Sequence, residues 1–257
     1  ADAAVLALQH GSRAQQVMQF YGKEAVEALK KYGKPALQMI DAYGFGALEL
    51  IELYKDSVVD AFKVGGEDAI QLAKDYGRPA LNAINTYGAR VIPIIKKGSP
   101  YALHALEHGA NAAFGALVLL ERVDADPEFK GVLKEGAKVI LKHGIDAANV
   151  IRSGGGAWAV KAIAKHEEKA LDELKKSNLY KRELSKLIYE HGPLALNALK
   201  RVGSDRVMNA VYKSQAVGVS TKSVLRALSK KATPEPYRGP GVPIEELKAM
   251  FKKKRKR

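Results

Sequence analysis

A glycine recurs every eleven residues through the first third of this chain, and this spacing constrains the fold more than any other feature. The series consists of Gly11, Gly22, Gly33, Gly44, Gly66, Gly77 and Gly88. Lys55 holds the one missing place, the residue before the glycine is usually Tyr, and a proline follows two residues later at Pro35 and Pro79. Glycine just past a helix end and proline at the first helical position mark a stop and a restart. Each unit therefore ends one helix and begins the next.

Each eleven-residue unit has the pattern of a short amphipathic helix. Counting from the glycine, Ala or Val usually follows at position three, with aliphatic residues at positions four and seven. These offsets lie on one face of a helix. Because a two-turn helix is unstable alone, it must pack on its neighbours. The sequence therefore predicts an all-α fold, an array of short helices that resembles α-solenoid repeat proteins, with its register lost after Gly109.

Composition divides the chain into three predicted regions. Residues 1–153 form the neutral repeat array, and the Ser153–Gly156 segment that follows has the composition of a linker. Residues 157–232 form a basic helical region, which begins with one longer helix over residues 157–176. Residues 233–257 carry several prolines and glycines and end on consecutive cations, which predicts an extended linker and a polybasic tail.

The net charge of +14 is confined to the C-terminal part of the chain. Residues 1–156 hold 18 Lys and Arg against 18 Asp and Glu, whereas residues 157–257 hold 24 against 10. Residues 177–257 alone hold 19 against 6. Such an asymmetry indicates a polyanion-binding segment joined to a neutral one. We therefore expect residues 177–257 to contact nucleic acid or another polyanion, and the neutral array to offer a surface to a protein partner.

A short stretch within residues 207–230 resembles the helix-turn-helix of lactose-repressor-type DNA-binding proteins. Ser214 lies four residues before Gly218, Ser220 is placed to cap a second helix, and Val224 and Leu228 follow at core spacing. In that family the second helix enters the major groove by its first residues. The resemblance implies base or backbone contacts from Thr221, Lys222, Ser223 and Arg226. Lys213 departs from the pattern, where an apolar residue is expected, and two further repeat helices joined by a glycine turn are the alternative interpretation.

The chain ends on six consecutive cations, which predicts contact with phosphates by counterion release. A run of this kind also has the form of a nuclear localisation signal or of a segment that lies on an anionic membrane. The cations expected to contact a polyanion outside the second helix are Lys213, Lys230, Lys231, Lys252, Lys253, Lys254, Arg255, Lys256 and Arg257.

The sequence contains no motif that predicts catalysis, a cofactor or a metal site. Cysteine is absent, which excludes disulfides and a thiolate nucleophile. His104 and His108 have a metal-ligand spacing on a helix, but no third ligand accompanies them. His108 also fills the Tyr position of the repeat, as His10 and His143 do, which favours a structural role for these histidines.

Three classes of function remain open on these patterns. The first is a non-enzymatic binding or scaffold protein whose basic C-terminal region contacts nucleic acid. The second is an exported effector or toxin with a basic, nuclease-like C-terminal module, which a chain beginning at Ala1 after a cleavage site would fit. The third is a helical protein on an anionic membrane surface, although the apolar helix faces are expected to be used in stacking. No apolar run is long enough to predict a transmembrane helix, so we expect a soluble protein.

Overall fold

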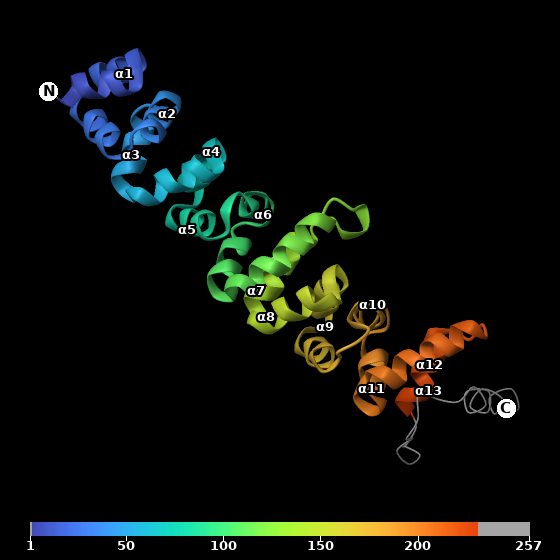
Figure 1. The fold of residues 1–257 in the computed structure, drawn as a ribbon. Helices are drawn as coiled ribbons and strands as arrows, with labels where there is room; N and C mark the ends of the chain where they lie inside the picture. The colour runs from blue at the N-terminus through green and yellow to red at the C-terminus, as the bar shows by residue number, and fades with distance from the viewer. Residues whose placement is uncertain (1, 231–257) are drawn as a thin grey trace, which may run out of the picture. The chain divides into compact units, whose positions relative to one another are not determined.

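The computed structural model describes residues 2–230, and nearly all of them lie in helices (Figure 1). No strand occurs within this range, which confirms the all-α fold class. A search of the same residues finds no helix with the length and hydropathy needed to cross a membrane. Lys231 and the predicted linker and tail over residues 233–257 lie outside the described range. Contacts divide the chain into two compact units, and the boundary between them falls after Glu107.

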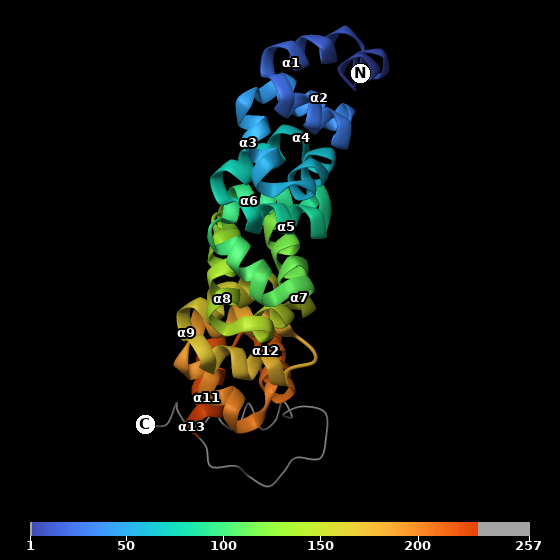
Figure 2. The ribbon, with the colours of Figure 1, turned by 90° about the vertical axis from the view of Figure 1, so that its left-hand side faces the viewer.

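The first unit is a succession of short helical segments (Figures 1 and 2). Its elements are α1 (Asp2–Tyr32), α2 (Lys34–Tyr43), α3 (Phe45–Tyr54), α4 (Asp56–Tyr76), α5 (Arg78–Tyr87), the 3-10 turn η1 (Gly88–Val91) and α6 (Ile92–Gly98). Helix α7 (Tyr101–Val123) contains the boundary between the units. Within this unit each helix packs on helices that lie close to it in sequence.

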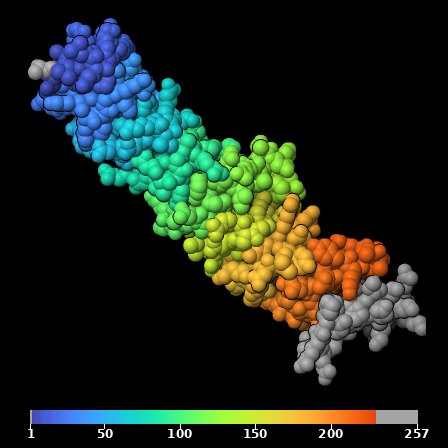
Figure 3. All heavy atoms as spheres, viewed as in Figure 1, coloured from blue at the N-terminus to red at the C-terminus, as the bar shows by residue number. Residues whose placement is uncertain are grey.

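The second unit continues with η2 (Pro127–Phe129), α8 (Val132–Val150), the π-helical turn η3 (Ile151–Gly155), α9 (Gly156–Lys176), α10 (Lys181–His191), α11 (Pro193–Val202), α12 (Ser204–Ala216) and α13 (Thr221–Lys230). Helices α8, α9 and α10 pack in sequence order, and α11, α12 and α13 pack on one another. Figure 3 shows the atoms of consecutive helices in contact within each unit.

The eleven-residue period is visible in the backbone as a single residue with positive φ between consecutive helical segments. Gly44 has φ 58° and ψ −131°, and its N–H donates to the Ile40 carbonyl at 2.8 Å. Gly33 shows both ends of the pattern. Its N–H donates to the Leu29 carbonyl of the preceding helix at 2.8 Å, and its carbonyl accepts from the Leu37 N–H of the following helix at 3.1 Å. The conformation favours glycine because it has no Cβ. At Gly33, Gly44 and Gly77 one helix therefore ends and another begins directly after it.

The residue three positions after each break is the most consistently buried part of the repeat. Ala36, Ala47, Val58 and Ala80 are fully inaccessible to solvent in the first unit. Small side chains at this position allow neighbouring helices to approach closely, and the larger aliphatic residues at positions four and seven fill the remaining core. The apolar periodicity of the sequence thus corresponds to the packed face of each segment.

Side chains connect each segment with segments two or three units further along the chain. The Tyr21 hydroxyl lies 2.8 Å from the ideal Cβ position of Gly44, which is 23 residues later in the chain. At the same offset, the Tyr54 hydroxyl lies 3.0 Å from the ideal Cβ position of Gly77. At an offset of 28 residues, Lys30 pairs with Asp2 at 2.7 Å. These offsets explain the Tyr position of the repeat, since its ring covers a later helix break.

Two local expectations about residues 153–176 were wrong, whereas the expected loss of register near residue 109 is confirmed. Ala110 takes the break conformation, with φ 43° and ψ −132°, but the next positive φ is that of Gly131, 21 residues further on, so the regular register is lost here as expected. The single long helix expected over residues 157–176 is broken at Glu167, with φ 52° and ψ −137°. Neither Ala110 nor Glu167 was expected as a break, because a break was sought as a glycine.

The Ser153–Gly156 segment is not an open linker. It falls within and just after the π-helical turn η3, where Ile151 and Gly155 are buried. A Cβ at Gly155 would lie 2.8 Å from the Val150 carbonyl oxygen, so the glycine permits close backbone packing there. Its composition therefore reflects a tight turn inside the second unit, and the unit boundary lies earlier, within α7.

Candidate nucleic-acid interface

Helices α12 and α13 are joined by a tight turn of four residues. Gly218 supplies the turn with φ 71°, and the Val219 N–H donates to the Ser214 carbonyl at 2.8 Å. Ser214, the small residue singled out in the sequence, is buried and donates its hydroxyl to the Val211 carbonyl at 2.7 Å. The Ser220 hydroxyl accepts from the Ser223 N–H at 3.3 Å, so Ser220 caps α13 as expected.

The core face of α13 holds the helix against α11 and α12. Val224 and Leu225 are fully buried and Leu228 is nearly so. From α11, the Arg201 guanidinium donates to the Ser229 carbonyl at 2.6 Å, near the C-terminal end of α13 where carbonyls lack helical partners. These contacts fix the orientation of α13 within the second unit.

The opposite face of α13 presents two of the expected contact residues to solvent. Lys222 and Arg226 are exposed and stand one helical turn apart on the same side. Thr221 is half-buried at the start of the helix. Ser223 is also half-buried, and its hydroxyl accepts a hydrogen bond from Ser220 at 2.9 Å, so its side chain belongs to the helix cap. Of the four residues that the resemblance implies on α13, Lys222 and Arg226 are therefore the two exposed ones.

The remaining expected contact residues lie elsewhere. Lys213 is half-buried on α12 and Lys230 is the last residue of α13. Lys231 and the cations from Lys252 to Arg257 are beyond the described range, so their contribution stays a prediction.

Helices α11 to α13 carry positive charge with almost no acidic compensation. Residues 193–230 include seven Lys and Arg and a single acidic residue, Asp205. Lys200, Lys222 and Arg226 form no ion pair with any described residue, whereas Lys31 of the first unit pairs with Asp56 at 2.9 Å. Uncompensated exposed cations attract phosphates from a distance and bind them with strong salt dependence.

The sequence analysis missed a second cationic feature, which gathers lysines and aromatic rings from η2, α9 and α10. The Lys161 ammonium lies 4.7 Å from the Phe129 ring centroid, 4.9 Å from that of Trp158 and 5.6 Å from that of Tyr189. Trp158 meets the other two rings at centroid distances of 5.4 Å and 5.6 Å. The ammonium also donates to the Glu128 carbonyl at 2.7 Å. Cation–π contact with several rings stabilises a charge without neutralising it.

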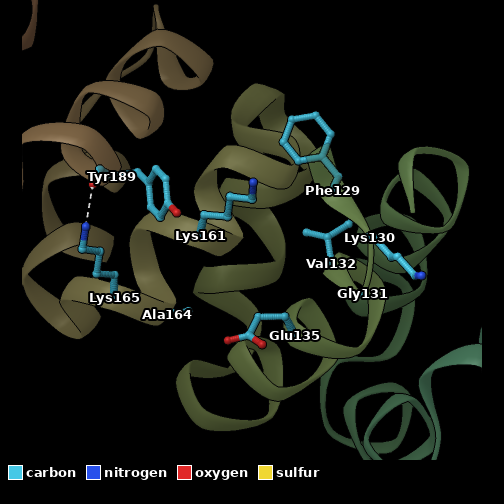
Figure 4. A pocket seen from close by; sticks show the side chains of 9 residues that line it. All are labelled: Phe129, Lys130, Gly131, Val132, Glu135, Lys161, Ala164, Lys165 and Tyr189. Carbon is cyan, nitrogen blue, oxygen red and sulfur yellow. Dashed lines mark hydrogen bonds between the residues drawn. The ribbon is translucent and has the colours of Figure 1, made fainter. Parts of the chain in front are cut away.

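Beside this cluster lies an open groove of about 410 Å³. We call it the lysine–aromatic groove; it is lined by Phe129, Lys130, Gly131, Val132, Glu135, Lys161, Ala164, Lys165 and Tyr189. Figure 4 shows Lys161 between the Tyr189 and Phe129 rings, and Lys165 bonded to the Tyr189 carbonyl. The only hint in the sequence is that the single Trp precedes Lys161 and Lys165 at helical spacing, and the ring partners come from distant segments.

His166 lies partly enclosed at the break between α10 and α11. Its Nε2 atom is buried and has no hydrogen-bond partner within residues 2–230, and its Cε1 atom lies 2.8 Å from the place where a Cβ of Gly192 would be. Burial, and then the charge of Lys165, lower the pKa of His166 below its ordinary value of 6.5. The ring is therefore neutral at pH 7. No group of three or more potential metal ligands occurs among the described residues.

This environment predicts that His166 makes the stability of the second unit decrease at acidic pH. Because its pKa is lower in the folded state, the unfolded chain binds a proton first, so stability is lost as the pH falls from about 6.5 towards the folded-state pKa. We expect His166→Asn to reduce the loss of unfolding free energy between pH 7 and pH 5, measured by urea denaturation. The matched control is His104→Asn, which changes an exposed histidine, and an equal effect of both variants would contradict the prediction.

Comparison with protein-family models, curated proteins and solved structures finds no match to this chain, so a functional assignment depends on its own residues and geometry.

Proposed function

We propose that this chain is a non-enzymatic binding or scaffold protein whose basic C-terminal region contacts nucleic acid. The observation that supports this most directly is the exposed pair Lys222 and Arg226 on α13. Helices α11 to α13, to which it belongs, contain seven basic residues and one acidic residue. The capped turn before α13 and the buried Val224 and Leu228 hold that pair on a fixed helix face. In this proposal the repeat helices of the first unit, with balanced charge, supply a surface for a protein partner.

The geometry favours contacts to the phosphate backbone over extensive base contacts. Of the four residues implied by the helix-turn-helix resemblance, Ser223 is engaged in the helix cap and Thr221 is half-buried. The two exposed cations suit phosphate oxygens, which position a protein without specifying sequence. We therefore propose that α13 contributes affinity and orientation.

This function predicts binding that weakens steeply with salt and depends on Lys222 and Arg226. Fluorescently labelled duplex DNA, single-stranded DNA and RNA would be titrated with the full chain across a salt series. The Lys222→Ala/Arg226→Ala variant should lose roughly tenfold or more in affinity near 0.1 M salt. The slope of log K against log salt should become shallower by about two, because each phosphate contact contributes about 0.9.

The first unit offers a matched control for this pair. Lys34 and Arg78 are exposed cations at the first positions of α2 and α5, and neither has an ion-pair partner among residues 2–230. We expect Lys34→Ala/Arg78→Ala to bind like the unmodified chain. A further chain that ends at Ala232 separates the contribution of the tail. Binding that ignores salt, or that Lys34→Ala/Arg78→Ala weakens as much as the α13 variant, would count against the proposal.

A further inference from the structure

We propose that the lysine–aromatic groove is a second anion site, which binds a phosphate group through Lys130, Lys161 and Lys165. It belongs to η2, α8, α9 and α10, and shares no residue with α13. The inference therefore goes beyond the proposed function and stands whether or not Lys222 and Arg226 contact nucleic acid.

The charge of the groove selects an anion. Three ammonium groups and a single carboxylate, that of Glu135, line it. Neither Lys161 nor Lys165 forms an ion pair with a carboxylate of residues 2–230, since their described hydrogen bonds are to carbonyl oxygens. Carbonyl dipoles and ring faces hold an ammonium in place but leave its full charge in the groove. The site thus retains positive potential that a carboxylate partner would have cancelled.

The ammonium groups of Lys161 and Lys165 are positioned in advance of binding. Lys161 donates one hydrogen bond to Glu128 O at 2.7 Å, and Lys165 donates one to Tyr189 O at 3.1 Å. A lysine ammonium has three N–H donors, and the described hydrogen bonds use one donor of each group. Fixing these side chains before binding reduces the entropy lost when a ligand is held. Phosphate oxygens suit several such donors at once because charge-assisted hydrogen bonds are the strong ones.

The rings in this groove support the lysines, which indicates that the site binds phosphate and not a base. The Phe129 ring has Lys161 over it, and Tyr189 has Lys165 at 4.9 Å from its centroid as well as Lys161. Their ring faces are therefore engaged by cations from the protein. The chemistry fits the phosphodiester of a nucleic acid and a small free phosphate alike, and binding should not depend on base identity.

Trp158 provides a direct readout, because it is the only tryptophan of the chain and its ring contacts Lys161 and, at 5.3 Å, Lys186. The full chain would be titrated with inorganic pyrophosphate in one arm and with a twelve-nucleotide oligo(dT) in the other, at constant ionic strength. A ligand that draws Lys161 towards itself changes the surroundings of the indole. We expect a saturable change in Trp158 emission.

Two substitutions and one control test the assignment. Lys130→Gln removes an exposed groove cation that has no hydrogen bond to a described residue, and Lys165→Gln removes one that is anchored. Each should raise the ligand concentration for half-maximal change by about tenfold, the effect of one charge-assisted hydrogen bond. Lys169→Gln alters an exposed cation of the same helix outside the groove and should leave the titration unchanged.

The two arms identify the source of the phosphate. A response to both ligands supports a general phosphate site, a response to oligo(dT) alone supports the nucleic-acid backbone, and a response to pyrophosphate alone supports a small phosphate. No saturable change in either arm, or equal weakening by Lys169→Gln, overturns the proposal. The Lys222→Ala/Arg226→Ala variant should keep the Trp158 response, which separates a failure of the groove from a failure of the α13 surface.

Discussion

Gly44→Ala is expected to lower the free energy of unfolding by about 2–3 kcal/mol, because the new methyl group meets two separate obstacles. The first is the backbone, since Gly44 has φ 58°, a conformation that costs other residues about 1–3 kcal/mol. The second is Tyr21, whose hydroxyl lies 2.8 Å from the place of the new Cβ. Chemical denaturation of the full chain measures the loss.

The repeat supplies controls that separate these two contributions. Gly66 has nearly the same conformation, with φ 55° and ψ −136°, but nothing lies within 4 Å of its ideal Cβ. Gly66→Ala should therefore lose only the backbone part, about 1–2 kcal/mol. Tyr21→Phe removes the hydroxyl, so it should recover part of the loss in the Gly44→Ala background. Equal losses for Gly44→Ala and Gly66→Ala would show that Tyr21 makes no contribution.

At Lys55, which occupies a break with φ 55° and ψ −130°, the same reasoning predicts that a substitution by glycine raises the free energy of unfolding. Lys55→Gly relieves the backbone conformation but increases the freedom of the unfolded chain, which costs about 0.5–1 kcal/mol. The net expectation is a small stabilisation, about 0.5–1.5 kcal/mol. A loss of stability would contradict the interpretation of Lys55 as a strained substitute for glycine.

The repeat could be predicted from the sequence because its critical positions demand a residue type that is easy to see. A positive φ favours glycine, so regular backbone breaks become regular glycines. The prediction missed the breaks at Ala110 and Glu167, where other residues take the same conformation. The residue type gives no sign of such positions, because Ala and Glu are both common inside helices.

One of the two candidate sites could be predicted from local sequence, and the other could not. The cap at Ser220, the turn at Gly218 and the buried Val224 lie within a few residues of one another, so their roles could be inferred from spacing. The lysine–aromatic groove joins Lys161 to Glu128, 33 residues away, and Lys165 to Tyr189, 24 residues away. No local pattern marks a cluster assembled across such distances.

The second large effect is expected at Gly136, which lies inside α8 and not at a break. Its ideal Cβ would fall 2.1 Å from Leu120 Cδ1 and 3.3 Å from Val160 Cγ2. Both neighbours are fully buried, so the leucine cannot move aside into solvent. Gly136→Ala gains about 1 kcal/mol of helix propensity, but overpacking of this kind costs about 1–3 kcal/mol or more. Gly136→Val adds two further methyl groups and should lose several kcal/mol, about 3–5.

A glycine in an open helical position tests whether packing is the cause. Gly46 lies in α3, has an ordinary helical φ and has nothing within 4 Å of its ideal Cβ. Gly46→Ala should therefore stabilise the protein by a few tenths to about 1 kcal/mol, opposite in sign to Gly136→Ala. Shortening the neighbour with Leu120→Val should reduce the cost of Gly136→Ala in a double-mutant cycle. Independent effects of the two substitutions would show that contact with the Leu120 side chain is not the cause of the loss at Gly136.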